Sequence, residues 1–134
     1  MKGSAIALIA AVLVVMGVFI SKNMSPDVNS IIKEIVRSVN DTFYQIKTDP
    51  DLSNAKCYRD GDKKGIVMEY NFSKDVDKSK IDPEKVKLKL TKELKHRQDI
   101  DKLASLGIYF VVIYNNHKGD ELLRVTITPE MLMN

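Results

Sequence analysis

The chain has 134 residues and a formal net charge of +3, so it has room for one ordinary domain and is mildly basic. The small charge excess is spread over many lysines, which indicates solubility more than a nucleic-acid partner. A single cysteine, Cys57, excludes an intramolecular disulfide. The thiol is either buried or available for an intermolecular bond, and we favour burial because free cysteine behaves as a small apolar side chain.

The first element is an uncharged apolar run from Ala5 to Ile20, which lies between Lys2 and Lys22. As a helix it spans about 24 Å, somewhat less than a hydrocarbon core of about 30 Å. We interpret it as a membrane-targeting segment. We expect its apolar side chains to contact the membrane, among them Ala5, Leu8, Leu13, Val18 and Ile20.

The run is either an uncleaved anchor or a signal peptide, and we favour the anchor. A cut after Ser21 would place Phe19 where signal peptidase requires a small residue. Residues 1–24 then form the anchor, and residues 25–134 form one domain outside the cytoplasm, because Lys2 favours a cytoplasmic N-terminus. We therefore expect a single-pass inner-membrane protein, or a periplasmic or secreted one if the run is cleaved.

An amphipathic helix is predicted from Pro26 to about Lys47, with Ser25 as its cap and Asp27 in its first turn. Apolar residues recur every three or four positions, and they are Val28, Ile31, Ile32, Ile35, Val36, Val39, Phe43 and Ile46. This stripe covers either a sheet of the same chain or a helix of another protein. We favour the sheet, since strands that need a cover follow.

The next segment predicts a hairpin. A weak strand, 55–59, is followed by a polar, glycine-containing connection, 60–65, and by alternating apolar residues over 66–72. Asp60 and Asp62 are better explained by a turn than by a calcium loop, because the twelve-residue ligand pattern is absent.

A second helix is predicted to start at Asp82 and Pro83 and to run to about Ser105, with a break near Gln98. Its lysines, Lys85, Lys87, Lys89, Lys92 and Lys95, would suit anionic lipid or an acidic partner if they shared one face. Their spacing wraps around the helix, so we expect a solvated surface.

The strongest strand is predicted at 108–114, where both faces are apolar, so it should be central in the sheet. A turn at 115–120, a return strand at 122–128 and a helix start at Pro129 follow. The order predicts an α+β fold of helix, hairpin, helix and hairpin. Its simplest form is a four-stranded antiparallel sheet with both helices on one face, and the alternative is a more curved sheet or partial barrel.

The second half resembles small exported bacterial envelope proteins, many of them without an assigned function. The residues that carry this resemblance are Leu103-Ala104-Ser105-Leu106-Gly107-Ile108, Tyr114, Gly119 and Val125-Thr126-Ile127-Thr128. The resemblance implies a location in a bacterial envelope.

No motif indicates catalysis, a metal site or a cofactor, and we expect a protein that is not an enzyme. His96 and His117 lack metal-ligand spacing, and Cys57 would need His117 beside it to act as a nucleophile. A nucleic-acid partner is not expected either, since no aromatic residue interrupts the lysines.

Two functions remain. The first is a membrane-tethered protein-binding module, an assembly or accessory factor of a bacterial envelope system, which would use a sheet edge or exposed tyrosines. The alternative is a periplasmic inhibitor or immunity protein that blocks a toxin or hydrolase with a protruding loop. The candidate partner contacts are Tyr109, Tyr114, Asn116, His117 and Lys118.

Overall fold

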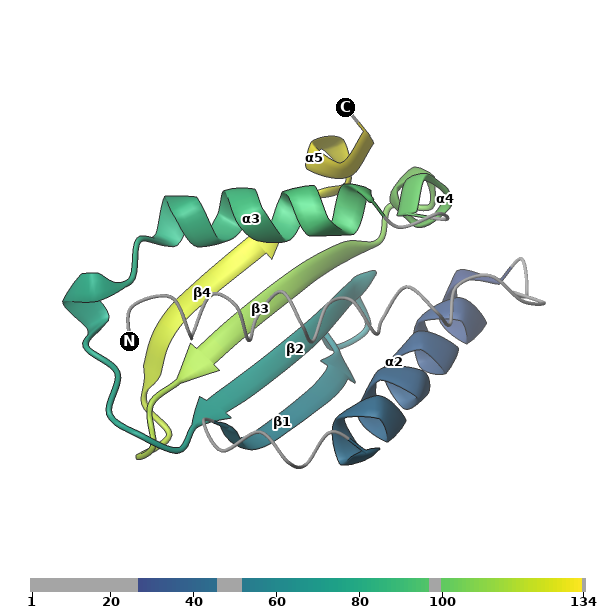
Figure 1. The fold of residues 1–134 in the computed structure, drawn as a ribbon. Helices are drawn as coiled ribbons and strands as arrows, with labels where there is room; N and C mark the ends of the chain where they lie inside the picture. Colours follow the sequence, from purple (N-terminus) through teal and green to yellow (C-terminus); the bar gives the residue numbers. More distant parts are fainter. Residues whose placement is uncertain (1–26, 46–51, 97–99, 134) are drawn as a thin grey trace.

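The computed structural model describes residues 27–45, 52–96 and 100–133 (Figure 1). The elements in chain order are α2 (Val28–Gln45), β1 (Leu52–Arg59), β2 (Gly65–Phe72), the short 3-10 helix η2 (Lys78–Lys80), α3 (Pro83–Lys95), α4 (Ile100–Ser105), β3 (Tyr109–Asn115), β4 (Glu121–Ile127) and α5 (Pro129–Met133).

Helix α2 confirms the predicted amphipathic helix within its described residues. Asp27 acts as its cap, because one carboxylate oxygen accepts from the Asn29 backbone at 3.3 Å and the other accepts from the Ser30 hydroxyl at 3.0 Å. The predicted cap, Ser25, lies outside the described residues together with Pro26. The predicted apolar stripe is buried at Ile31, Ile32, Ile35 and Val39.

The predicted hairpins are both present. β1 pairs with β2 and β3 pairs with β4, each in antiparallel orientation. β1 begins at Leu52, earlier than predicted. The connection from Asp60 to Gly65 is a turn, with Gly61 at a φ of 61° and a hydrogen bond of 2.9 Å from the Asp60 N–H to the Gly65 carbonyl.

The prediction of an entirely antiparallel sheet is wrong. The strand order is β1-β2-β3-β4, and the central pair, β2 and β3, is parallel. The reason is the connection between the hairpins: α3 and α4 return the chain to the end of the sheet where β2 started, so β3 must run in the direction of β2.

Helices α3 and α4 begin and end at recognisable signals. The Asp82 carboxylate accepts from the Glu84 backbone at 3.1 Å and Pro83 occupies the first turn, as predicted. The segment predicted as a helix with a break near Gln98 contains two helices, since α3 ends at Lys95 and α4 starts at Ile100. Gly107, with a φ of 85°, follows α4 and turns the chain toward β3.

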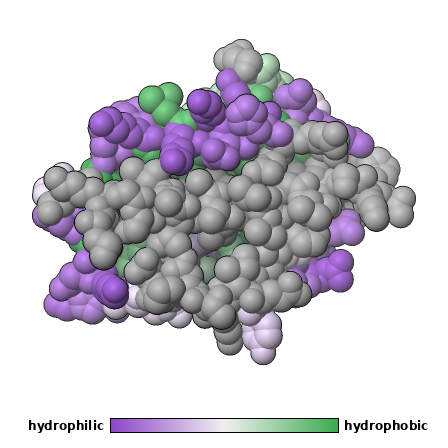
Figure 2. Space-filling view, in the orientation of Figure 1, coloured by the Kyte–Doolittle hydropathy of each residue, from purple (hydrophilic) through white to green (hydrophobic). Residues whose placement is uncertain are grey.

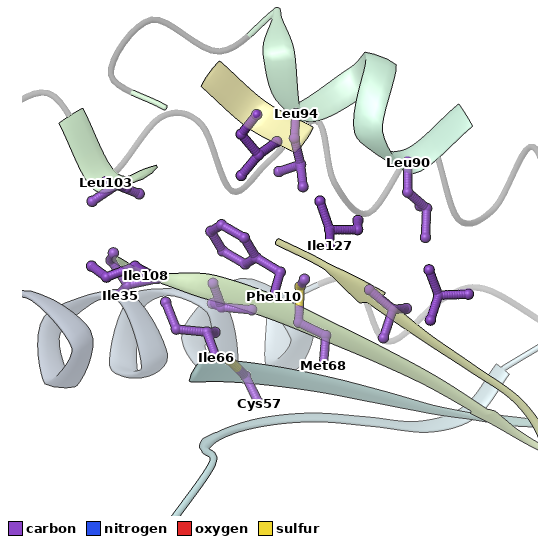
Figure 3. Packing of buried hydrophobic residues seen from close by; sticks show 14 of the residues in the cluster. Ile35, Cys57, Ile66, Met68, Leu90, Leu94, Leu103, Ile108, Phe110 and Ile127 are labelled. Carbon is purple, nitrogen blue, oxygen red and sulfur yellow. The ribbon is translucent and has the colours of Figure 1, made fainter. Parts of the chain in front are cut away.

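All the long described helices bury their apolar side chains on the same face of the sheet, as expected. Figure 1 shows α2 beside β1 and α3 beside β4, at opposite edges of the sheet. Between the helices and the sheet lies the main core, where Ile35, Leu94 and Leu103 meet Ile66, Phe110 and Ile127 (Figure 3). Cys57 belongs to this core and is 4% exposed, which confirms that the thiol is buried.

The predicted anchor, Ala5 to Ile20, lies outside the described residues. Among the helices of the described ranges, none combines the length and the apolar composition that crossing a bilayer requires.

Candidate functional site

The sheet has a second face, opposite the helices, and this face is the candidate site. Successive residues of a strand point to opposite sides, so the residues next to the core positions define it. The second face consists of Asn54, Lys56, Tyr58, Gly65, Val67, Glu69, Asn71, Tyr109, Val111, Ile113, Asn115, Arg124 and Thr126.

Strand register arranges these residues in rows across the sheet. Tyr58, Val67, Val111 and Thr126 form one row. The next row consists of Lys56, Glu69, Ile113 and Arg124. The third row contains three asparagines, Asn54, Asn71 and Asn115. The face is therefore apolar in the middle and polar toward one end.

Glu69 is the centre of the polar part. Its Oε1 accepts from the Tyr58 hydroxyl at 2.8 Å, and its Oε2 accepts from the Asn115 side-chain amide at 2.6 Å. The same Asn115 amide nitrogen donates to the Asn71 side-chain oxygen at 2.9 Å. Asn115 is 4% exposed, so these bonds satisfy an amide that would be costly to bury alone.

This network keeps Glu69 charged. Partial burial alone would raise the pKa of Glu69, but the hydrogen bonds from Tyr58 and Asn115, with nearby Lys56 and Arg124, lower it below its usual value. Lys56 lies 3.9 Å from Oε1 of Glu69. The site is therefore organised around a carboxylate that already has its donors, which suits recognition more than proton transfer.

Tyr58 is the most exposed large ring of the face, at 37%. The Lys56 ammonium lies 5.7 Å from the centre of this ring. Burial, followed by the hydrogen bond to Glu69, raises the pKa of Tyr58 to about 12. Tyr58 therefore stays neutral at physiological pH and keeps a fixed orientation.

Tyr109 packs at the other end, over Gly65 of the adjacent strand. A side chain at position 65 would overlap the Tyr109 ring, which explains why a glycine stands there inside a strand. The Tyr109 hydroxyl donates to Asp60 at 2.6 Å, and this bond is the main reason that the pKa of Tyr109 is raised to about 12.

A second apolar cluster lies between these two tyrosines. Val67, Val111 and Ile113 are each buried, and Tyr109 packs against them. Within the described part of the chain, this cluster contains no side chain from a helix. Among the described residues, the apolar centre of the second face is therefore formed by side chains of the sheet.

The structure separates the predicted partner contacts. Tyr109 lies on the second face, but Tyr114 is 2% exposed and stacks on Tyr70 in the main core, so the prediction that its ring is exposed is wrong. The strand is apolar on both sides, and composition alone did not reveal which side faces the helices. Asn116, His117 and Lys118 form the turn between β3 and β4.

That turn is closed rather than extended. The Asn116 side-chain oxygen accepts from the backbone of Lys118 and of Asp120, both at 2.9 Å, and Gly119 has a φ of 89°. His117 contacts Asp75 at 2.9 Å, which holds the turn against the loop after β2.

Sequence reasoning missed Tyr58, Asn115 and Arg124 as members of the site. Alternation in β2 had already placed Glu69 and Asn71 on the side opposite the core. The signal that was available is the same alternation in β1 and β4. Alternation does not tell which residues of neighbouring strands lie side by side. Only the parallel pairing of β2 with β3 brings Asn115 beside Glu69.

The chemistry of Cys57 does not favour catalysis. Burial raises the pKa of its thiol to about 12, whereas a nucleophilic cysteine needs a lowered pKa. His117, the base that it would need, contacts Asp75 in the turn. Over the described ranges, no group of three His, Cys, Asp or Glu side chains is arranged to hold a metal ion.

Comparison of the chain with protein-family models, curated proteins and solved structures finds no match.

Proposed function

We propose that the protein is a membrane-tethered, extracytoplasmic binding module, an assembly or accessory factor of a bacterial envelope system, and that it works by contact and not by catalysis. The apolar run Ala5 to Ile20 supplies the tether. The second face of the sheet supplies the contact surface. Its partner is a protein with a flat surface of mixed polarity.

The observation that carries this proposal is the composition of the second face. Tyr58 is half-exposed beside the buried cluster of Val67 and Val111, and Lys56 and Arg124 are more than half exposed around it. Tyrosine and arginine around a water-excluding apolar centre are typical of residues that dominate protein interfaces.

The geometry of the Glu69 network also supports a contact role. Tyr58 and Asn115 are held by hydrogen bonds within the sheet, so they lose little side-chain entropy when a partner binds. The inhibitor alternative lacks comparable support, because the turn from Asn116 to Asp120 is closed on itself. Its charged residues Lys118 and Asp120 have opposite signs and leave no excess of either charge.

The test is site-specific photo-crosslinking in native membranes with the full chain. A photoreactive phenylalanine analogue at Tyr58 is expected to give a discrete adduct with one envelope protein. The matched control carries the analogue at Tyr44, an exposed tyrosine on α2, away from the second face. An adduct from position 44 and none from position 58 would reject the second face as the contact surface.

A further inference from the structure

Helix α3 presents a basic outer side, which its sequence alone had not revealed. Four of its lysines are exposed while Val86, Leu90 and Leu94 are buried on the opposite side. We define the basic face by the residues Lys85, Leu88, Lys89, Lys92 and Lys95. Their spacing of three and four places them on one side of the helix, and Lys87 alone lies apart and is partly covered. The five lysines do not share one face, as expected, but four of them do.

The charges of the basic face are not neutralised within the domain. In the ranges that the structure describes, no acidic side chain forms a salt bridge with these four lysines. Like charges at positions i and i+4, as in Lys85 and Lys89, repel each other. Lys92 and Lys95 suit the C-terminal end of a helix dipole, but Lys85 in the first turn does not. Stabilisation of the helix therefore does not explain why these four lysines lie on one side of α3.

An exposed leucine lies among the lysines. Leu88 is 70% exposed, the highest exposure of any large aliphatic side chain in the described residues. Figure 2 shows hydrophilic side chains gathered over α3, with hydrophobic atoms among them. A helix that carries lysines around a protruding leucine matches a surface that has anionic groups above an apolar layer.

We propose that the basic face of α3 rests on an anionic lipid bilayer, with the lysines on the headgroups and Leu88 at the acyl boundary. This inference rests on the membrane tether of the proposed function. An acidic protein would also attract the lysines, but it gives no reason for an exposed leucine at their centre. Nucleic acid is less suitable still, because the basic face contains no aromatic ring.

The start of α2, to which the apolar run is joined, lies near one end of α3, and this is compatible with α3 resting on the same bilayer. Figure 1 shows that α2 begins at the end of the sheet where α3 ends and α4 lies. Residues 21–26, which join the apolar run to α2, reach at most about 20 Å when extended, so the domain is kept close to the bilayer. Since α3 covers the core side of the sheet, a bilayer on its outer side leaves the second face directed away from the membrane.

The experiment places a polarity-sensitive fluorophore at Leu88→Cys in the full chain, reconstituted into vesicles. Cys57 is buried, so unmodified protein treated with the dye serves to measure background labelling. With phosphatidylglycerol in phosphatidylcholine vesicles, we expect a blue shift and quenching by a lipid-borne quencher. Both should disappear in pure phosphatidylcholine and in high salt.

A charge-matched pair of variants tests the residues. Lys85, Lys89, Lys92 and Lys95 changed to glutamine should weaken the lipid response at least tenfold. The same change at four other exposed lysines, Lys33, Lys63, Lys78 and Lys118, should leave it nearly unchanged. Circular dichroism checks that both variants fold, and the salt dependence of the unsubstituted face tests the proposal without them.

Each other outcome overturns the proposal. An equal response in both vesicle types, or equal effects of the two variants, would exclude a specific lipid surface. A response to added polyglutamate and none to anionic vesicles would assign the basic face to an acidic protein. The crosslink from Tyr58 is an independent readout, so a lost lipid response with an intact crosslink rejects this inference and leaves the contact surface in place.

Discussion

Three ionisable side chains are buried in their protonated, neutral forms on the core side of the sheet. Burial raises the pKa of the Cys57 thiol to about 12 and raises the pKa of Tyr70 and Tyr114 well above the usual tyrosine value. The rings of Tyr70 and Tyr114 stack with their centres 5.3 Å apart. Within the described ranges, neither buried hydroxyl has a hydrogen-bond partner. These groups are stable only in their neutral forms.

Stability should therefore fall at alkaline pH. Each group has a higher pKa folded than unfolded, so its contribution is complete below the unfolded pKa and is lost as pH rises toward the folded one. Between about pH 8 and pH 10.5, the Cys57 thiol should cost about 2 kcal/mol of unfolding free energy, because only the unfolded thiol ionises.

Urea unfolding at both pH values measures this loss. A Cys57→Ala variant is expected to be less stable than the parent at pH 8, but to lose about 2 kcal/mol less than the parent over the same interval. An identical pH dependence in parent and variant would show that the thiol ionises freely in the folded protein.

At the scale of elements, α2 protects an edge of the sheet. β1 is an edge strand, and its Cys57 backbone would otherwise present an unpaired N–H and C=O. The Asn40 amide of α2 occupies both: its oxygen accepts from the Cys57 N–H and its nitrogen donates to the Cys57 carbonyl, each at 2.8 Å. The helix therefore substitutes for a neighbouring strand at this point.

Replacing Asn40 by alanine should remove both hydrogen bonds and destabilise the domain by about 2 kcal/mol, because two partly buried backbone groups lose their partners. The opened edge should also promote association at high protein concentration. Urea unfolding and sedimentation measure the two effects. Asp41→Ala, at an exposed neighbouring position, is the control, and an equal effect of both substitutions would argue against edge protection.

Most elements could be predicted because their signals are local. The spacing of Ile31, Ile35 and Val39 defines a helix face, and Asp82 with Pro83 marks a helix start, without knowledge of the rest of the chain. The pairing of β2 with β3 depends on contacts between distant segments, and no local pattern contains it. The same absence of register hid the neighbours of Glu69.

Exposure was harder to predict than secondary structure. Tyr114 belongs to a strand with apolar residues on both sides, so its orientation followed only from the packing of α2 and α3 on one face. The lysines of α3 are a related case. Val86, Leu90 and Leu94 define the buried side of the helix, and only with that side known do four of the lysines lie together on the exposed side.

At the scale of the whole molecule, the chain forms a helix layer and a sheet whose second face carries tyrosines and charges around an apolar centre. A contact function requires that this face be presented on one side of a membrane. In the proposed function, the apolar run from Ala5 to Ile20 serves this purpose. Residues 21–26 join this run to Asp27, the first described residue, and reach at most about 20 Å when extended. Location is therefore the central claim of the account.

Membrane topology tests this claim most directly. A cysteine introduced at Lys33, on the exposed side of α2, provides a reporter in the full chain, because Cys57 is buried and protonated. In intact cells or spheroplasts, a membrane-impermeant maleimide should label position 33, and the labelled protein should stay with the membrane after alkaline extraction. Labelling only after the membrane is permeabilised, or recovery of the chain in the cytosol, would contradict the account.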